Sequence, residues 1–340
     1  DGKLDVELSG MVASLRAVEV VAEKNSNVKS TQMSVEKLAI KTIKQVPVVF
    51  GEADVLRVVT TLPGVSSAGE AGTGFNVRGG STDQNLILFN EATIYNPSHV
   101  FGFFSAFNPD LIKSVELYKS TIPEKFGGRL SSVLDVAVRE GNSKKISGTA
   151  GIGPLTSKLT IEGPVFSDKT TFIAGVRTTY SNWLLRTLNT DYTDSRASFY
   201  DVSLNLNHTI NTKNNLYLSG YASNDEFRLN SDTTYRYGNK NWNVNWKHIF
   251  NNKLYMVVGG GQDQYDYSVQ SREVKENAFR LSFDIKQSHF RTDFTYSPNN
   301  NHVLDFGVNS IYYQLQPGSY KPNADESLVT PKTLQHEQAL

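Results

Sequence analysis

The residue types that most often carry catalysis or hold metals are scattered along this sequence. Its six histidines stand at positions 99, 208, 248, 289, 302 and 336, and no two have the spacing of a metal-binding pair on one helix turn. Cysteine is absent, which excludes thiolate catalysis, disulfides and cysteine-bound metals within these 340 residues. The Gly-x-Ser-x-Gly elbow of serine hydrolases is also missing. We therefore expect no enzyme, no metal site and no cofactor.

Two arginines beside paired glycines are more distinctive. Arg78 precedes Gly79-Gly80, and Arg129 follows Gly127-Gly128. Glycine adopts positive φ more readily than any other residue, and tight turns need such residues. A phosphate-binding loop would lead into a helix through Lys-Ser or Lys-Thr, and neither motif has that context. The glycines therefore predict two tight turns beside the arginines.

Composition limits the kind of partner. Lys and Arg together number 34, as do Asp and Glu, so net charge gives no global attraction to nucleic acid. No run approaches the ~20 apolar residues of a membrane-spanning helix, and mean hydropathy is −0.37. Membrane-spanning β-strands are compatible with this value, because only every second residue in them is apolar. The chain starts at Asp1 without a signal peptide, so we expect a mature, trimmed or partial start.

The first 145 residues predict a small α+β unit. One helix is expected to start at Ser34, within 34–38, and another to cover 52–62, where apolar residues recur at helical spacing. Pro63-Gly64 would end the second helix. Strands are expected at 86–89, 115–118 and 132–138.

From Ile146 onward polar and apolar residues alternate with the period of a β-strand. In the segment 279–286, Phe, Leu, Phe and Ile alternate with Arg, Ser, Asp and Lys. About nine strands are expected, near 146–152, 155–163, 170–185, 198–211, 215–229, 234–250, 254–270, 278–297 and 302–316.

The connections between these strands alternate in length. Short polar turns at 211–214, 251–253 and 298–301 alternate with longer connections such as 186–197 and 271–277. Short turns on one rim and longer loops on the other are typical of outer-membrane barrels. Aromatic residues near strand ends suit a membrane interface, although cross-strand packing in a soluble β-protein would give a similar pattern.

Four ordered blocks resemble the plug domain of TonB-dependent outer-membrane receptors. They are 46–65, with a Leu-Pro-Gly-Val exit from the helix, 75–90, with Arg78-Gly79-Gly80, 108–119, and 126–136, with Gly127-Gly128-Arg129. The local version around 95–105 looks most like receptors of the Bacteroidetes. Where the family usually has Asp-Gly this chain has Asn90-Glu91, and we expect Asn90 to adopt positive φ.

The resemblance implies an architecture and a location. Residues 1–24 would hold the end of an N-terminal extension and a TonB box, 25–145 an α+β plug domain, and 146–340 the first part of an antiparallel transmembrane β-barrel. Family barrels have about 22 strands, so the wall expected here is incomplete. Either the chain continues beyond Leu340 or only a portion of the protein is present. The implied location is the bacterial outer membrane, in contact with its lipid.

The resemblance also implies a periplasmic partner. Val18, Glu19, Val20, Val21 and Ala22 are similar in place and character to a TonB box. A TonB-type energy-coupling protein binds such a segment by adding it as a β-strand. A plain edge strand or linker would have the same composition.

Arg78 and Arg129 would lie inside the barrel. There each guanidinium would either bind wall carboxylates, with Glu162, Asp201 and Asp284 as candidates, or cap carbonyls of its own turn.

The loop 93–105 is the candidate ligand site. Tyr95, Asn96, His99 and Phe101 combine ring faces with polar groups, which suits a sugar, peptide or siderophore, although these residues could equally form plug core. Phe103 and Phe104 are expected in the core.

The implied function is energy-coupled import of a scarce ligand, a siderophore, glycan or peptide, through movement of the plug. The alternative is a receptor-like barrel that acts as a structural or assembly scaffold with a surface lipoprotein. The sequence identifies neither the ligand nor the need for a lipoprotein, and it indicates no nucleic-acid partner.

Overall fold

The computed structural model describes residues 35–46, 52–69, 74–187, 195–228 and 233–340, and the expected TonB box at 18–22 lies outside them. The helices in these ranges are α2 (Ile40–Gln45), α3 (Val55–Thr60) and α4 (Asn182–Thr187), with short 3-10 turns η1 (Thr82–Gln84), η2 (Val100–Gly102) and η3 (Lys275–Asn277). Among the described residues, no helix has the length and apolar character needed to cross a membrane.

The first region, which we call the α+β unit, is built on a mixed five-stranded sheet in the order β1-β8-β9-β4-β5. The strands are β1 (Val35–Leu38), β4 (Asn85–Phe89), β5 (Ala92–Thr93), β8 (Ile112–Tyr118) and β9 (Ser132–Val138). β4 and β9 are parallel, and the other neighbours are antiparallel. Two small hairpins complete the unit, formed by β2 (Val65–Ser67) with β3 (Phe75–Val77) and by β6 (Ser98–His99) with β7 (Phe104–Ser105).

The prediction of a helix at 34–38 is wrong, because Val35–Leu38 form the edge strand β1. Leu38 lies opposite Val115 of β8 and is only 5% exposed. Pairing at the sheet edge therefore buries an apolar side chain that local propensity assigned to a helix. The other elements expected in this region are confirmed, since α3 lies within 52–62 and β4, β8 and β9 cover the three expected strands.

The core of the α+β unit lies between the two helices and the sheet. Val58, Val115 and Leu134 are fully buried in it, and burial of an apolar side chain contributes about 1.5–3 kcal/mol. Tyr221, which belongs to the second region, joins the same core and packs edge-on against Phe89 at 5.5 Å between ring centroids. The two regions therefore share part of one core.

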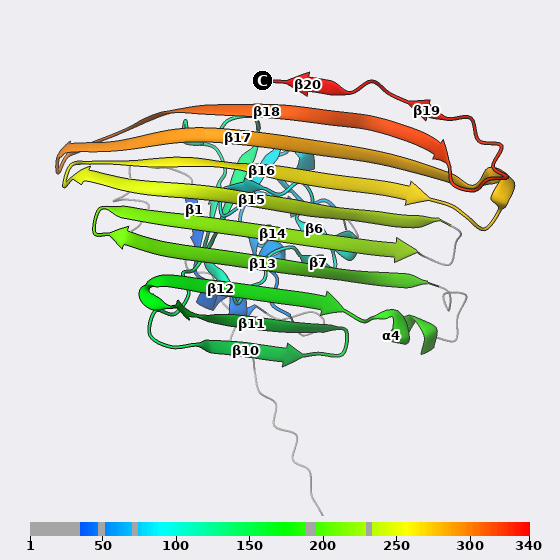
Figure 1. The fold of residues 1–340 in the computed structure, drawn as a ribbon, viewed down its shortest axis with the longest axis horizontal. Helices are drawn as coiled ribbons and strands as arrows, with labels where there is room; N and C mark the ends of the chain where they lie inside the picture. The colour runs from blue at the N-terminus through cyan, green and yellow to red at the C-terminus, as the bar shows by residue number, and fades with distance from the viewer. Residues whose placement is uncertain (1–34, 47–51, 70–73, 188–194, 229–232) are drawn as a thin grey trace, which may run out of the picture.

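The second region is one antiparallel sheet whose strands follow chain order, here called the wall sheet (Figure 1). Its strands are β10 (Ser147–Ile152), β11 (Thr156–Val165), β12 (Ser167–Thr179), β13 (Arg196–Asn211), β14 (Asn214–Arg228), β15 (Thr234–Asn251), β16 (Leu254–Gln270), β17 (Phe279–Asn299) and β18 (His302–Pro322). The short strands β19 (Lys332–Thr333) and β20 (Glu337–Ala339) both pair with β18. The expected row of strands is confirmed.

The third expected strand, 170–185, is wrong at its end. β12 stops at Thr179, and α4 follows at Asn182–Thr187. The neighbouring β13 begins only at Arg196, so residues 180–185 have no ladder partner. The backbone instead closes a helical turn, in which the Leu185 N–H donates to the Ser181 carbonyl (3.2 Å).

The expected asymmetry of the connections is confirmed. Two residues each join β13 to β14, β15 to β16 and β17 to β18, at the left of Figure 1, whereas α4 and η3 lie in longer connections at the right. We call the left end the inner rim and the right end the outer rim, since short turns face the periplasm in outer-membrane barrels.

The two faces of the wall sheet differ in character. On β15, Asn239, Asn241 and Asn243 face the α+β unit and are 2–5% exposed, whereas the alternate residue Trp242 is 52% exposed on the opposite face. Val176 and Phe290 are also exposed large apolar residues. An apolar outer face and a polar inner face are the arrangement that a barrel wall needs in lipid.

Candidate functional site

The two arginine-glycine motifs lie next to each other. Arg78 and Gly79 form a turn at positive φ, 49° and 83°. A Cβ on Gly80 would overlap the Ser131 hydroxyl, so only glycine permits this approach. The Ser131 hydroxyl donates to the Val77 carbonyl (2.9 Å) and so joins the second motif to the first. The sequence predicted both turns but not their contact.

Of the two roles expected for Arg78 and Arg129, pairing with wall carboxylates is not seen among the described residues, and capping of its own turn is seen for Arg129. Arg129 donates from Nη1 to its own Gly128 carbonyl (2.8 Å), and Arg78 is exposed. Bonding to a carbonyl of the same turn orders fewer groups than reaching a partner on another strand. Of the candidate carboxylates, Glu162 binds Arg139 bidentately, and Asp201 binds another arginine described below.

Charged side chains from both regions meet in a buried charge cluster. It consists of Glu52 and His99 from the α+β unit and Arg177, Asp201 and Asp225 from β12, β13 and β14, and each is at most 7% exposed. Burial of charges is costly unless they are paired and hydrogen-bonded. The geometry of these five residues therefore decides how firmly the two regions hold together.

Arg177 is the centre of this cluster. Its Nε donates to Asp201 on the neighbouring strand (2.9 Å), and its Nη1 donates to Glu52 of the α+β unit (2.7 Å). Its Nη2 donates to the Ser105 carbonyl (3.0 Å). One guanidinium thus binds the wall and the α+β unit at the same time, and its loss would leave carboxylates buried without their partner.

His99 lies between two wall carboxylates. Its Nδ1 is 2.8 Å from Asp225 Oδ2, its Nε2 is 3.1 Å from Asp201 Oδ2, and its ring stacks on Phe199 at 4.2 Å. Burial alone would lower the pKa of His99, but the carboxylates of Asp225 and Asp201 more than offset this and raise the pKa to about 9. The imidazole is therefore charged at neutral pH, and both ring nitrogens donate.

The expected ligand-facing role of His99 is not supported by its position, because the residue is 1% exposed and both nitrogens are engaged. Phe103 is 42% exposed and so does not form core as expected, whereas Phe104 is buried as expected. Phe104 packs against Phe199 of β13 at 5.4 Å, and this contact occupies the buried side of the loop.

The other residues expected to face the ligand lie toward the outer rim, in a group of rings that we call the outer aromatic cluster. It comprises Tyr95 and Phe101 from the α+β unit and Phe227, Tyr235, Tyr237, Tyr265 and Tyr267 from β14, β15 and β16. Phe101 is 4.7 Å from the Phe227 ring, and its N–H donates to the Tyr237 hydroxyl (3.0 Å). Asn96 holds a local turn by accepting from the Ser98 N–H (3.2 Å).

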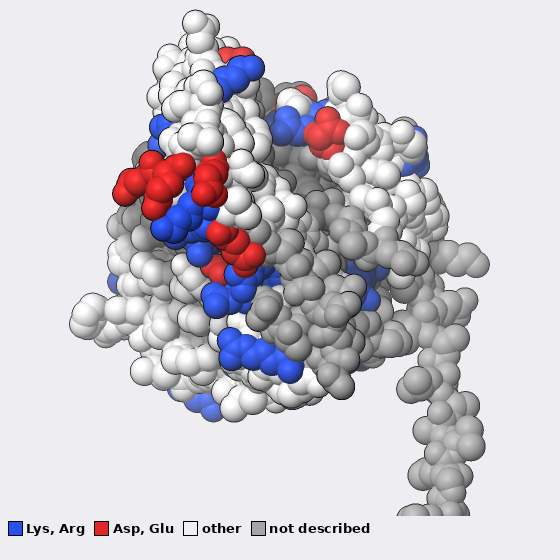
Figure 2. Space-filling view, turned by 90° about the vertical axis from the view of Figure 1, so that its right-hand side faces the viewer, with Lys and Arg blue, Asp and Glu red and all other residues white. Residues whose placement is uncertain are grey.

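Charges at the outer rim are mixed in sign. Figure 2 views the molecule from this end, and acidic and basic side chains lie next to one another there. The ion pairs Arg236–Glu226 (2.8 Å) and Lys275–Glu326 (2.9 Å) belong to this end. The described part of this rim therefore has no single-sign field that would select a ligand by its charge.

Asp54 ties helix α3 to the strand that reaches Arg177. Its carboxylate caps α3 by accepting from the Arg57 N–H (3.1 Å) and also accepts from the Ser105 N–H (3.0 Å). We expect Asp54→Ala to lower the free energy of unfolding of the α+β unit by about 1–2 kcal/mol, because both N–H groups lose their acceptor. Urea unfolding followed by hydrogen exchange measures this. Asp54→Asn keeps an acceptor and should lose less; equal losses would show that charge, not acceptance, is what matters.

Sequence reasoning missed Glu52, Arg177 and Asp225 as a unit. The sequence does contain a signal for the two wall residues. A charged residue at a strand position that faces the interior of a barrel needs a buried partner. Arg177 and Asp225 both occupy such positions. The partner Glu52 carries no such signal, because it stands in an irregular segment before α3.

Within the described residues there is no cluster of His, Asp and Glu that would hold a metal ion. Residues 27–131 match the family model described as TonB-dependent Receptor Plug Domain. No curated protein sequence matches the chain.

Solved structures resemble the whole arrangement of unit and wall. The chain is 12% identical to the ferric enterobactin receptor PfeA of Pseudomonas aeruginosa, with a TM-score of 0.63 over 84% of this chain and 50% of that one. BauA, the ferric preacinetobactin receptor of Acinetobacter baumannii, is also 12% identical, with a TM-score of 0.63 over 89% of this chain and 53% of that one. The outer membrane transporter YddB of Escherichia coli is 13% identical, with a TM-score of 0.60 over 90% of this chain and 52% of that one. At such identity the likeness establishes the fold, and the chain spans about half the length of these structures. The expected likeness to Bacteroidetes receptors stays a prediction.

Proposed function

Because this chain joins a TonB-dependent receptor plug domain to part of a barrel with the fold of TonB-dependent receptors, we propose that it imports a scarce ligand by energy-coupled movement of the plug. TonB-dependent receptors are outer-membrane transporters and not enzymes. In this proposal residues 25–145 are the plug, 146–340 are the first part of the wall, and 1–24 hold the TonB box.

The observation that carries the proposal is the buried charge cluster between plug and wall. An importer must stay shut at rest and open only when it is pulled, so plug and wall need contacts that are firm but reversible. Arg177 with Glu52, and His99 with Asp225, cross this boundary through charged hydrogen bonds rather than through apolar packing alone. Such pairs fix orientation, and they exchange for water when the plug moves.

The outer aromatic cluster is the proposed ligand site. Tyr95 and Phe101 of the plug gather with the tyrosines of β15 and β16 near the outer rim, where Tyr235, Tyr265 and Tyr267 are partly exposed and Tyr237 is buried. Rings with polar tips suit siderophores, glycans and peptides alike. The mixed charges of the outer rim favour no ligand sign, so the cluster defines a place for the ligand rather than its identity.

Deletion of residues 18–22 from the full-length protein tests the proposal. We expect uptake of radiolabelled ligand to fall to the level of cells that lack the energy coupler, while ligand binding at the surface stays unchanged. The reason is that the coupler grips this segment by strand addition and pulls the plug through it. Deletion of five residues at 327–331, in the loop between β18 and β19, is the matched control.

Unchanged uptake in the 18–22 deletion would remove the TonB-box assignment. Normal surface assembly together with a lipoprotein, but without any ligand binding or energy-dependent uptake in the unaltered protein, would favour the scaffold instead of the importer.

A further inference from the structure

One row of side chains on β15 runs from the outer rim to the inner rim on the face toward the plug. Alternate residues of a strand share a face, and on β15 these are Tyr235, Tyr237, Asn239, Asn241, Asn243, Asn245 and Lys247. The two tyrosines belong to the outer aromatic cluster. The next three residues, which we call the asparagine row (Asn239, Asn241 and Asn243), are buried against the plug.

The asparagine row binds the main chain of plug residues 90–96, which include the turn at Asn90-Glu91 and the short strand β5. Asn239 donates from Nδ2 to the Asn96 carbonyl (2.9 Å) and Asn241 to the Thr93 carbonyl (2.7 Å). Asn243 donates to a third carbonyl of the same plug segment, at its start. The row also receives a main-chain N–H, since Asn239 Oδ1 accepts from Tyr95 (3.2 Å). All four bonds reach main-chain atoms of the plug, so this contact does not depend on the identity of plug side chains.

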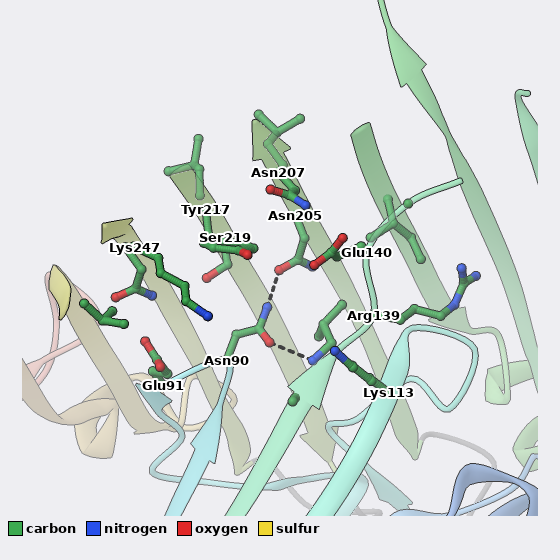
Figure 3. A pocket seen from close by; sticks show the side chains of 18 of the residues that line it. Asn90, Glu91, Lys113, Arg139, Glu140, Asn205, Asn207, Tyr217, Ser219 and Lys247 are labelled. Atoms are coloured by element: carbon green, nitrogen blue, oxygen red, sulfur yellow. Dashed lines mark hydrogen bonds between the residues drawn. The ribbon is translucent and has the colours of Figure 1, made fainter. Parts of the chain in front are cut away.

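The same strand continues into a cavity at the inner rim, which we call the inner cavity. It has a volume of about 340 Å³ and lies between the wall and the ends of plug strands β8 and β9. Figure 3 shows side chains from both sides around this space. Those used below are Lys113, Ala137 and Glu140 from the plug side and Asn207 and Lys247 from the wall.

The chemistry of the inner cavity matches the ends and the backbone of a short peptide. Lys113 and Lys247 are ammonium groups without an ion-pair partner among the described residues, so either fits a terminal carboxylate. Glu140 is exposed and fits a terminal ammonium. The Oδ1 atom of Asn207 is buried without a hydrogen-bond partner in the described structure, which leaves an acceptor for a main-chain N–H.

We propose that the inner cavity is a second binding station for an imported peptide, reached along the row of β15. The inference rests on the proposed import function and names peptide as the ligand class. The asparagine row favours a peptide over a glycan, because its three side-chain amides already bind main-chain carbonyls of the plug, those of Asn90, Thr93 and Asn96. The unpaired opposite charges in the cavity, Lys113 and Lys247 on one hand and Glu140 on the other, add the same preference, since neutral glycans carry no charged termini.

A reporter inside the inner cavity tests the proposal without any uptake measurement. These 340 residues contain no cysteine, so Ala137→Cys introduces a single reactive thiol among them in the full-length protein, with any cysteine outside them replaced. Trialanine is the probe, and it enters detergent-solubilised receptor from the inner rim. At ten times its dissociation constant we expect maleimide modification to slow about tenfold, because only the unliganded fraction reacts. Lys253→Cys, in the exposed inner-rim turn, is the control and should react at the same rate with or without trialanine.

Second substitutions then identify the groups that bind. Lys247→Met and Asn207→Leu should each reduce the protection, whereas Lys240→Met, on the outward phase of the same strand, should not. Maltotriose should give no protection. The proposal is overturned if trialanine fails to protect, if maltotriose protects equally well, or if Lys247→Met behaves like Lys240→Met. Because this experiment does not measure uptake, such a result would not contradict the proposed import function. Energy-dependent uptake tests that function separately.

Discussion

Replacing Arg177 with methionine is expected to weaken the docking of the plug on the wall by about 3–5 kcal/mol, because Glu52 and Asp201 stay buried without their guanidinium partner and His99, which contacts Asp201, is the remaining cation of the buried charge cluster. Methionine fills similar volume, so the loss is one of charge and hydrogen bonds. The measurement is hydrogen exchange of the amides of β8 and β9, which should become faster in the variant while the wall strands keep their protection. Cells with the variant should also become more permeable to large antibiotics.

Two further variants separate charge from packing. Arg177→Met combined with Glu52→Gln and Asp201→Asn removes the uncompensated carboxylates, and it should recover part of the lost protection. Arg139→Met breaks the half-exposed pair with Glu162 and should cost about 1 kcal/mol or less, because water screens that pair. Protection of β8 and β9 that is the same in Arg177→Met as in the unaltered protein would refute the role assigned to the cluster.

Sequence reasoning succeeded where structure is local. A two-residue period and short polar turns are local properties, and they located the strands of the wall sheet to within three residues, except at the ends of β12 and β18, which lie six residues from the expected positions. The turn at Asn90 was also predicted, and its φ is 49°. Glu91 follows with φ 74°, a conformation that a side chain disfavours, and its ion pair with Arg291 of β17 shows what holds it there.

Errors arose where pairing across the chain overrides local preference. Val35–Leu38 become a strand only because β8, almost 80 residues later, offers an edge. Residues 180–185 continue the strand pattern but lack a neighbour, so the chain turns into α4 instead. Neither outcome can be read from composition alone, because each depends on what lies beside the segment in space.

The same limit applies to the candidate site. The motifs with arginine and glycine were easy to find, yet the hydrogen bond that Arg129 makes within the described residues goes to a carbonyl of its own turn. In the buried charge cluster, the groups that join plug and wall are separated by 102 to 126 residues along the chain, as in His99 with Asp201 and Asp225 or Arg177 with Glu52. Ion-pair partners at such separation have no local signature, so topology has to be known first.

The pH dependence of plug docking follows from His99. Its pKa is about 9 in the docked state, raised from an unperturbed value near 6.5 by the carboxylates of Asp225 and Asp201 against the opposing effect of burial. Because the pKa of His99 is higher in the docked state, the imidazole keeps its proton up to a higher pH when the plug is docked than when it is undocked. The stabilisation is therefore complete below about pH 6.5 and is lost as pH rises through 9. The shift corresponds to about 3 kcal/mol of docking free energy across this window.

Denaturant-induced release of the plug, followed between pH 6 and pH 9.5 by hydrogen exchange corrected for intrinsic rates, measures this loss. His99→Gln keeps a hydrogen-bonding side chain but cannot hold the charge, so it should already be weakened at pH 6 and should show little further change up to pH 9.5. The substitution also removes the stacking of the imidazole on Phe199. That loss reduces the docking free energy by the same amount at every pH, so it does not produce a dependence on pH. A slope that persists in His99→Gln would assign the titration to another group. A flat profile in the unaltered protein would mean that the imidazole is held neutral between Asp201 and Asp225, and the plug would then depend on Arg177 alone for its cationic contact with Asp201 and Glu52.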